Sequence, residues 1–154
     1  MNQTLVFKNR QRVRRVDTPL LRRITRWLLA ESLCVAEYEL CVHLVGAAEM
    51  ARVNEAFLQH EGSTDVITFN HLDSVRPEAL HGELFICLDD AVKQAKEFKT
   101  TWQSELTRYV IHGLLHLRGH DDLKPIARRA MKKEENRLLR ETSRAFTLSE
   151  LARK

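Results

Sequence analysis

Apolar residues recur at the spacing of one helix face just after a basic N-terminal segment. The repeat is formed by Leu20, Leu21, Ile24, Trp27 and Leu28. Thr18 precedes it as a candidate capping residue, and Pro19 stands at the first helical position, where its missing N–H is tolerated. The pattern therefore predicts a helix over residues 19–32.

Short runs rich in β-branched, aromatic and other apolar residues predict four strands. These runs cover residues 5–10, 39–45, 65–70 and 82–89. Gly46 ends the second run, and the segment AAEMARVNEAFLQ that follows it has the pattern of a helix. The polar residues 60–64 predict a turn before the third strand, in which Thr64 and Asp65 shape the chain.

Three helices are expected after the fourth strand. Asp89 or Asp90 can cap a short helix that ends near Phe98. Thr100 and Gln103 have the spacing of a capping box, so the next helix is expected to start there.

That second helix is predicted to run to Leu117 and to end at Gly119, which can adopt the left-handed conformation of a helix end. Pro125 then opens a long, charged last helix. We summarise the order as β-α-β-α-β-β-α-α, in one α+β domain over residues 1–154. The expected architecture is a mixed four-stranded sheet with helices packed on it; the sequence does not define strand order or oligomeric state.

The composition is that of an ordinary globular domain, with 154 residues of which 44% are hydrophobic. A chain of this size can build a core without disulfides, and the odd, widely spaced Cys34, Cys41 and Cys87 are interpreted as reduced core residues. The N-terminus lacks the pattern of a secretion signal, and no apolar run reaches the length of a membrane span. We therefore expect a cytoplasmic protein with no membrane partner.

Charge is divided unevenly along the chain. Residues 1–26 hold eight Lys or Arg against one acid, residues 124–154 hold ten against four, and the net charge of the whole chain is +4, so the middle is acidic. Basic flanks of this size supply phosphate contacts in nucleic-acid-binding proteins. Solvated helix faces explain the same residues equally well.

The segment His112-Gly-Leu-Leu-His116-Leu-Arg-Gly-His-Asp-Asp122 carries the candidate chemistry. Histidines four residues apart lie on one face of a helix, where two imidazoles can bind one metal ion. Gly119 lets the chain turn back, so that a third ligand can approach from another direction. His120, Asp121 and Asp122 are the candidates for that ligand.

Asp122 is preferred because it follows His116 by six residues, the spacing of the third ligand in HExxHxxGxxH metalloproteases. A carboxylate binds zinc at about the same distance as an imidazole, but two histidines and one carboxylate also match the facial triad of iron enzymes. Gly113 occupies the position of the peptidase glutamate, which disfavours peptidase chemistry. This glycine is explained either by close helix packing or by access for substrate.

The same segment resembles the signature of the YbeY family, which has the form H-G-x-L-H-L-x-G-[aromatic or His]-D-H. Asn54 in RVNEAFLQ, the run STDVITF at residues 63–69 and the run GELFICL at residues 82–88 agree in order and spacing. The likeness covers most of residues 40–122. It implies a single-domain α+β metalloprotein that binds one zinc-type ion, with His112 and His116 as ligands and Asp122 in the place of the third histidine.

The resemblance also implies a function. Family members are described as single-strand-specific endoribonucleases in the maturation of ribosomal RNA, especially at the 3′ end of the small-subunit RNA, and in ribosome quality control. We therefore expect a metal-dependent endoribonuclease whose catalytic and metal-binding residues are His112, His116 and Asp122, with ribosomal RNA and ribosomal particles as partners.

One departure bears on this function: the arginine that the family carries four residues after the asparagine is here Leu58. Arg52, His60 or Arg118 could supply a cation in its place, although Arg118 is better explained as a solvated helix end. Asp121 or Glu105 could act as a base or orient a ligand, and Glu105 is expected to be a solvated helix charge.

Two alternative functions follow. The chain could be a catalytically weak or inactive ribosome-assembly factor with a structural metal, which Leu58 and Asp122 favour. It could also be a metal hydrolase of small molecules or peptides, against which the basic flanks and the missing glutamate argue.

Overall fold

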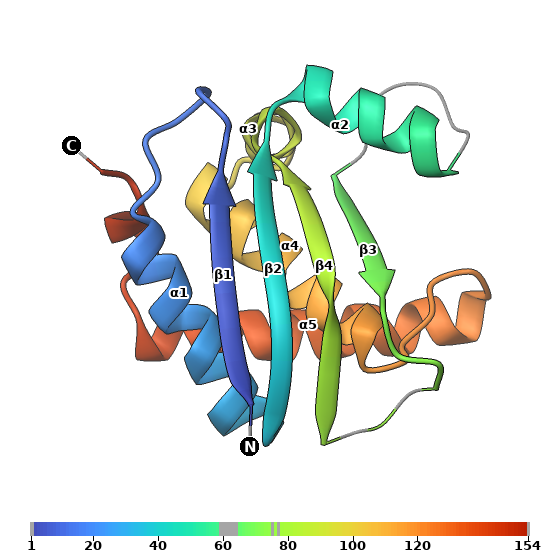
Figure 1. The fold of residues 1–154 in the computed structure, drawn as a ribbon. Coiled ribbons are helices and arrows are strands. Elements are labelled where there is room, and N and C mark those ends of the chain that lie inside the picture. The colour runs from blue at the N-terminus through green and yellow to red at the C-terminus, as the bar shows by residue number, and fades with distance from the viewer. Residues whose placement is uncertain (1, 59–64, 75, 77, 154) are drawn as a thin grey trace.

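The sheet of the computed structural model has four strands in the spatial order β1-β2-β4-β3 (Figure 1). The strands are β1 Gln3–Asn9, β2 Glu37–Val45, β3 Val66–Asn70 and β4 Ala79–Cys87. β2 pairs in parallel with both β1 and β4, whereas β3 pairs antiparallel with β4. The structure describes residues 2–58, 65–74, 76 and 78–153, without the side chain of Leu58, so the predicted turn at 60–64, including His60 and Thr64, lies outside the described residues.

Five helices accompany this sheet. They are α1 Thr18–Trp27, α2 Ala47–Val53, α3 Leu88–Phe98, α4 Trp102–Leu117 and α5 Pro125–Ala145. Single π-helical turns, Leu28–Ser32 and Asn54–Leu58, extend α1 and α2. The α+β class and the mixed four-stranded sheet are therefore confirmed.

The last strand is followed by three α-helices, as the individual segments predicted, whereas the summary order β-α-β-α-β-β-α-α contains only two there. α3 and α4 are separate because Lys99 adopts a left-handed conformation, with φ of 56°, that ends α3. Thr101 then caps α4 by accepting a hydrogen bond from the Ser104 backbone N–H.

Three capping predictions were wrong. Thr101 caps α4 in place of Thr100, and Asp17 caps α1 in place of Thr18. Neither Asp89 nor Asp90 caps α3, because this helix begins at Leu88 and both aspartates lie in its first turn.

The main core lies between one face of the sheet and the helices α1, α3, α4 and α5 (Figure 1). Alternate residues of the central strands, such as Leu44 and Leu84, are fully buried there. Gly113 of α4 is buried against Leu84, and an added Cβ would lie 2.7 Å from Leu84 Cδ2. Of the two explanations for this glycine, the structure supports close helix packing, because Gly113 faces the sheet and leaves no room for substrate.

On the opposite face of the sheet, α2 packs over a small second core at one end. That core contains Val45, Met50, Ile67 and Cys87. The structure describes no helix that is long and apolar enough to cross a membrane.

The cysteines are all free, but only Cys87 is a core residue. Cys41 is half-buried, and Cys34 is exposed in a left-handed conformation with φ of 52° after the π-helical turn of α1. The interpretation of Cys34 as a core residue was wrong, because an apolar neighbourhood in sequence does not determine on which side of a chain reversal a side chain lies.

Candidate metal centre

The two histidines of the metal motif come from the last two turns of α4. His112 and His116 are four residues apart and lie on the same face, with ring centroids 4.7 Å apart. The helix ends as predicted at Gly119, whose φ of 100° is left-handed, and the His120 backbone N–H bonds back to the Leu115 carbonyl at 3.0 Å. This reversal brings the chain back past the histidines.

Asp122 lies on the returning segment and completes a group of three donor atoms. Its Oδ2 is 3.6 Å from His116 Nε2 and 3.9 Å from His112 Nε2, and the two Nε2 atoms are 3.1 Å apart. His112, His116 and Asp122 thus form one of the groups in the described chain that could hold a metal ion. All three predicted ligands are brought together, and His120 is not part of the group.

The chemistry of this donor set fits a divalent cation. Two ligand atoms about 2.1 Å from a tetrahedral zinc ion lie roughly 3.4 Å apart, and the three distances between the donor atoms bracket that value. The His112 Nδ1 faces Glu135 Oε2 at 2.9 Å, so a neutral His112 carries its proton on Nδ1 and directs the Nε2 lone pair toward His116 and Asp122.

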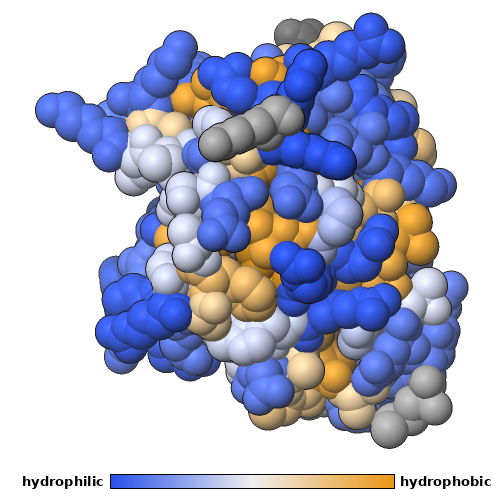
Figure 2. All heavy atoms as spheres, turned by 90° about the vertical axis from the view of Figure 1, so that its left-hand side faces the viewer, coloured by the Kyte–Doolittle hydropathy of each residue, from blue (hydrophilic) through white to orange (hydrophobic). Residues whose placement is uncertain are grey.

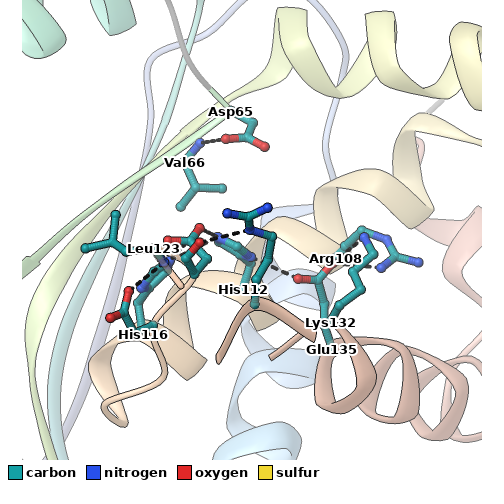
Figure 3. Close-up of polar contacts among 11 residues, drawn as sticks. Asp65, Val66, Arg108, His112, His116, Leu123, Lys132 and Glu135 are labelled. Atoms are coloured by element: carbon teal, nitrogen blue, oxygen red, sulfur yellow. Dashed lines mark hydrogen bonds and ion pairs between the residues drawn. The ribbon is translucent and has the colours of Figure 1, made fainter. Parts of the chain in front are cut away.

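Glu135 is the residue that the sequence reasoning missed. It lies on α5 with 4% of its surface exposed, and it accepts hydrogen bonds from His112 and from Arg108 Nη1, the latter at 2.7 Å (Figure 3). Burial raises the pKa of Glu135, but these hydrogen bonds outweigh it and lower the pKa to about 2. A signal was present: Glu135 interrupts the buried positions Met131, Leu138 and Thr142 at helical spacing.

The two histidines have opposite electrostatic surroundings. Burial opposes the charged form of His112, yet the hydrogen bond to Glu135 and the charge of that carboxylate raise the pKa of His112 overall. Burial and the neighbouring His112 lower the pKa of His116. His116 is therefore the more readily available as a neutral ligand, whereas His112 owes its orientation to Glu135.

A cavity of about 780 Å³ opens beside His112 and Asp122. One wall is the basic face of α5 and the other includes apolar rings. Its lining includes Asp65, Phe98, Glu105, Arg108, Tyr109, Arg128, Arg129, Met131 and Lys132. The candidate metal centre is thus at the edge of a space large enough for a ligand.

Other sequence-predicted residues have structural roles. Glu105 is buried and accepts a hydrogen bond from the Thr100 hydroxyl at 3.1 Å, which corrects its interpretation as a solvated charge. Arg118 is half-buried and donates to the Leu33 carbonyl at 2.6 Å, so it is neither a solvated helix end nor a cation at the metal centre. Asp121 is exposed and accepts from the Leu123 N–H, and Arg52 is exposed on α2, outside the cavity lining.

Asp65 contributes both to the start of β3 and to the lining of the cavity. Its Oδ1 accepts a hydrogen bond from the Val66 N–H at 2.8 Å, as expected for a residue that shapes the start of β3. Asp65 also lines the cavity beside His112. Asp65 therefore adds a negative charge near the histidines, and this charge contributes to the raised pKa of His112.

A second group of donors, Cys41, His43 and Glu83, lies on the open face of the sheet. His43 Nδ1 faces Arg10 Nη2 at 3.1 Å, and since arginine can only donate, Nδ1 is the acceptor. The proton of a neutral His43 is then on Nε2, which donates to Glu83 at 2.9 Å. Both ring nitrogens are engaged, so this group is a hydrogen-bond network rather than a second metal centre.

Comparison with known proteins identifies relatives of the chain. The family model of Endoribonuclease YbeY matches residues 6–143. The Endoribonuclease YbeY of Salinibacter ruber is 37% identical over 94 residues, which are 57% of this chain and 60% of that protein. The Endoribonuclease YbeY of Phocaeicola vulgatus is 34% identical over 117 residues, 75% of this chain and 83% of that protein.

The match to several of these relatives is partial, since the chain spans about three fifths of the length of the Salinibacter ruber and Chlorobium phaeovibrioides proteins. Among solved structures, the solution structure of TM1509 from Thermotoga maritima has a TM-score of 0.64 at 23% sequence identity. It covers 90% of this chain and 87% of that protein, which shows a shared fold.

We predict that Asp122 rather than His120 is the third ligand. Asp122→Ala should raise the Kd for Zn²⁺ by at least about 100-fold, because loss of a ligand weakens metal affinity more than loss of a residue that only orients a ligand. His120→Ala should bind Zn²⁺ like the wild type. Competition with a chromogenic chelator gives the affinities, and elemental analysis gives the stoichiometry. Stoichiometric zinc in Asp122→Ala together with its loss in His120→Ala would contradict this assignment.

We also predict that Glu135 tunes the centre through His112. Glu135→Gln keeps the shape of the side chain but removes the charge that favours the Nδ1 proton, so it should weaken Zn²⁺ binding roughly 10- to 100-fold. The matched control is Glu134→Gln, which changes a neighbouring carboxylate that pairs with Arg137 on the outside of α5. Equal zinc affinities for the two variants, measured in the same competition assay, would exclude the orienting role.

Proposed function

This chain belongs to the Endoribonuclease YbeY family, and on that premise we propose that it is a metal-dependent endoribonuclease that cleaves single-stranded RNA. The observation that carries the proposal is the convergence of His112, His116 and Asp122 at the rim of a cavity with a basic wall. The family relationship supplies the reaction class, and the local geometry supports it.

The three side chains are suited to hold one zinc-type ion. When bound there, such an ion polarises a phosphate oxygen and activates a water molecule for hydrolysis. His112 is kept in the ligating tautomer by Glu135. Asp122 contributes a negative charge that three neutral imidazoles lack, so the centre is a weaker Lewis acid than one made of three histidines.

The cavity offers contacts suited to a single strand. Arg129 and Lys132 lie on its α5 wall, where they can bind phosphates. Phe98, with 62% of its surface exposed, lines the same space. Exposed aromatic rings stack with unpaired bases, which a duplex keeps inside the helix, so this lining favours single-stranded RNA.

Arg128 is suited to the charge of the reacting phosphate. Its Nε donates to the Asp122 backbone carbonyl at 3.1 Å, which fixes the side chain beside the metal ligands. Arg128 also lines the cavity. A guanidinium in this place binds a phosphate through two donors and offsets the charge that builds up during cleavage, a role that Leu58 cannot fill.

In the cell we place this activity in the cytoplasm, in the maturation of ribosomal RNA at the 3′ end of the small-subunit RNA and in ribosome quality control. Ribosomal RNA and ribosomal particles are then its partners, and zinc is the proposed metal. The resemblance of residues 40–122 to the family signature supports this assignment.

The alternative is a catalytically weak or inactive ribosome-assembly factor with a structural metal. Two residues favour it: Leu58 stands in the place of an arginine, and Asp122 in the place of a histidine. In that case chelation lowers the melting temperature and leaves the affinity for RNA unchanged.

Cleavage is expected to depend on the metal and on His116. The zinc-loaded protein should cut a single-stranded RNA oligonucleotide but not the same sequence in a duplex, and His116→Ala should reduce the rate to that of the chelated wild type. His81→Ala changes an exposed histidine on the open sheet face and serves as the control. A zinc-loaded wild type that is inert on RNA but binds ribosomal particles would favour the alternative function.

Arg128 is expected to act on the rate more than on binding of the metal. Arg128→Ala should lower kcat on single-stranded RNA roughly 100-fold, the effect of removing one donor to a developing charge, with Zn²⁺ affinity retained. Arg128→Lys should recover only part of the rate, because lysine cannot bind bidentately. Arg140→Ala on the same helix, outside the cavity lining, is the control. A wild-type kcat in Arg128→Ala would refute this role.

A further inference from the structure

A second cavity, of about 570 Å³, lies on another part of the molecule. It is formed by the loop between β1 and α1 together with the C-terminal segment, and we call it the arginine cavity. Its lining includes Arg12, Arg14, Arg15 and Arg153. In Figure 1 this loop and the C-terminus lie on the left, away from the segment after α4 that carries Asp122. Figure 2 views the molecule from this side, where strongly hydrophilic side chains dominate the upper part of the surface.

The loop that carries three of these arginines is held by one buried side chain. Gln11 is only 8% exposed, and its Oε1 accepts hydrogen bonds from the Val13 and Arg14 backbone N–H groups at 2.7 and 3.0 Å. Its Nε2 donates to Asn9 Oδ1 and to the Arg14 carbonyl. Gln11 therefore fixes the backbone from which the arginines project.

The C-terminal segment completes the cavity through backbone pairing with the same loop. Val16 and Ala152 form an isolated antiparallel bridge, and the Arg153 N–H donates to the Arg15 carbonyl at 2.9 Å. Leu151 is fully buried and anchors this pairing in the core. Two segments from opposite ends of the sequence are thus joined where their arginines line one space.

These guanidinium groups lack acidic partners. No ion pair involves Arg12, Arg14, Arg15 or Arg153 within the described part of the chain. The nearest acid in sequence, Asp17, is engaged as the cap of α1. Arg10 differs, because it pairs with Glu49 at 2.7 Å and does not line the cavity. Four like charges around one cavity create a positive local potential that attracts an anion.

We propose that the arginine cavity binds the phosphodiester backbone of RNA at a point remote from the cleaved strand. Guanidinium groups match phosphate oxygens with two parallel hydrogen bonds, and several of them around a rigid loop suit consecutive phosphates. The choice of RNA as the anion rests on the proposed function, whereas the anion site rests on the geometry alone. The site thus binds structured RNA that flanks the cleaved strand.

The test compares two double variants of equal net charge. Arg12→Ala/Arg15→Ala removes two cavity arginines, and Arg140→Ala/Arg144→Ala removes two exposed arginines of α5 that do not line the cavity. Binding is measured by fluorescence anisotropy over a series of KCl concentrations. The probes are a short single-stranded RNA and a hairpin RNA with the same strand as its tail, and binding is measured with chelator present so that neither RNA is cleaved.

The cavity variant should bind the hairpin RNA more weakly than the control variant, and its salt slope should fall by about 2, one for each phosphate contact removed. The loss should be confined to the hairpin RNA. At low salt the melting temperature of the cavity variant should equal or exceed that of the wild type, because repulsion is relieved, and inorganic pyrophosphate should raise it less.

Equal hairpin affinity and equal salt slope in the two double variants would overturn the proposal. So would an equal loss for both RNAs, or binding of anionic phospholipid vesicles but not of RNA. These outcomes are separate from those of the proposed function. If the wild type does not cleave RNA but its hairpin binding still depends on Arg12 and Arg15, the nuclease proposal is refuted and the arginine cavity is retained as an RNA-binding site. If the wild type cleaves RNA but its hairpin binding does not depend on Arg12 and Arg15, only the proposal for the arginine cavity is refuted.

Discussion

The hydrogen bond between His112 Nδ1 and Glu135 Oε2 is the contact on which the candidate metal centre depends. It joins α4 to α5, fixes the tautomer of one ligand, and places a carboxylate with a pKa of about 2 behind it. A buried carboxylate is costly unless its oxygens are bonded, and Arg108 and Lys132 complete that requirement. The ion-pair network therefore couples the docking of α5 to the geometry of the ligands.

The backbone conformation at two glycines also determines where the side chains of the candidate metal centre lie. Because Gly113 lets α4 approach Leu84 closely, the helix that carries His112 and His116 is held at a short distance from β4. Because Gly119 reverses the chain within a few residues, Asp122 returns to the histidines without a long loop. Two glycines thus position the three side chains of the candidate metal centre, one through packing and one through its left-handed conformation.

The sequence predicted what depends on local pattern and failed where tertiary contacts decide. Strand and helix periodicity located the sheet, the long helices and the end of α4, and motif spacing brought together His112, His116 and Asp122. Glu105 and Glu135 were misjudged or missed because burial of a helical glutamate depends on which helix packs over it. Arg128 could not be found either, since its link to Asp122 is made through a backbone carbonyl.

The fold places the two basic segments of the chain at two different surfaces. The basic start of α5 lies beside the metal ligands, whereas the N-terminal arginines lie with the last residues of the chain around the arginine cavity. If RNA is the ligand, charges that bind one short strand need only surround the cleft, and those that lie elsewhere can contact RNA only where it extends beyond the cleft. Under the proposed function, the two basic surfaces together suit a single strand that is attached to a larger folded RNA, whereas a free oligonucleotide would contact only the surface beside the candidate metal centre.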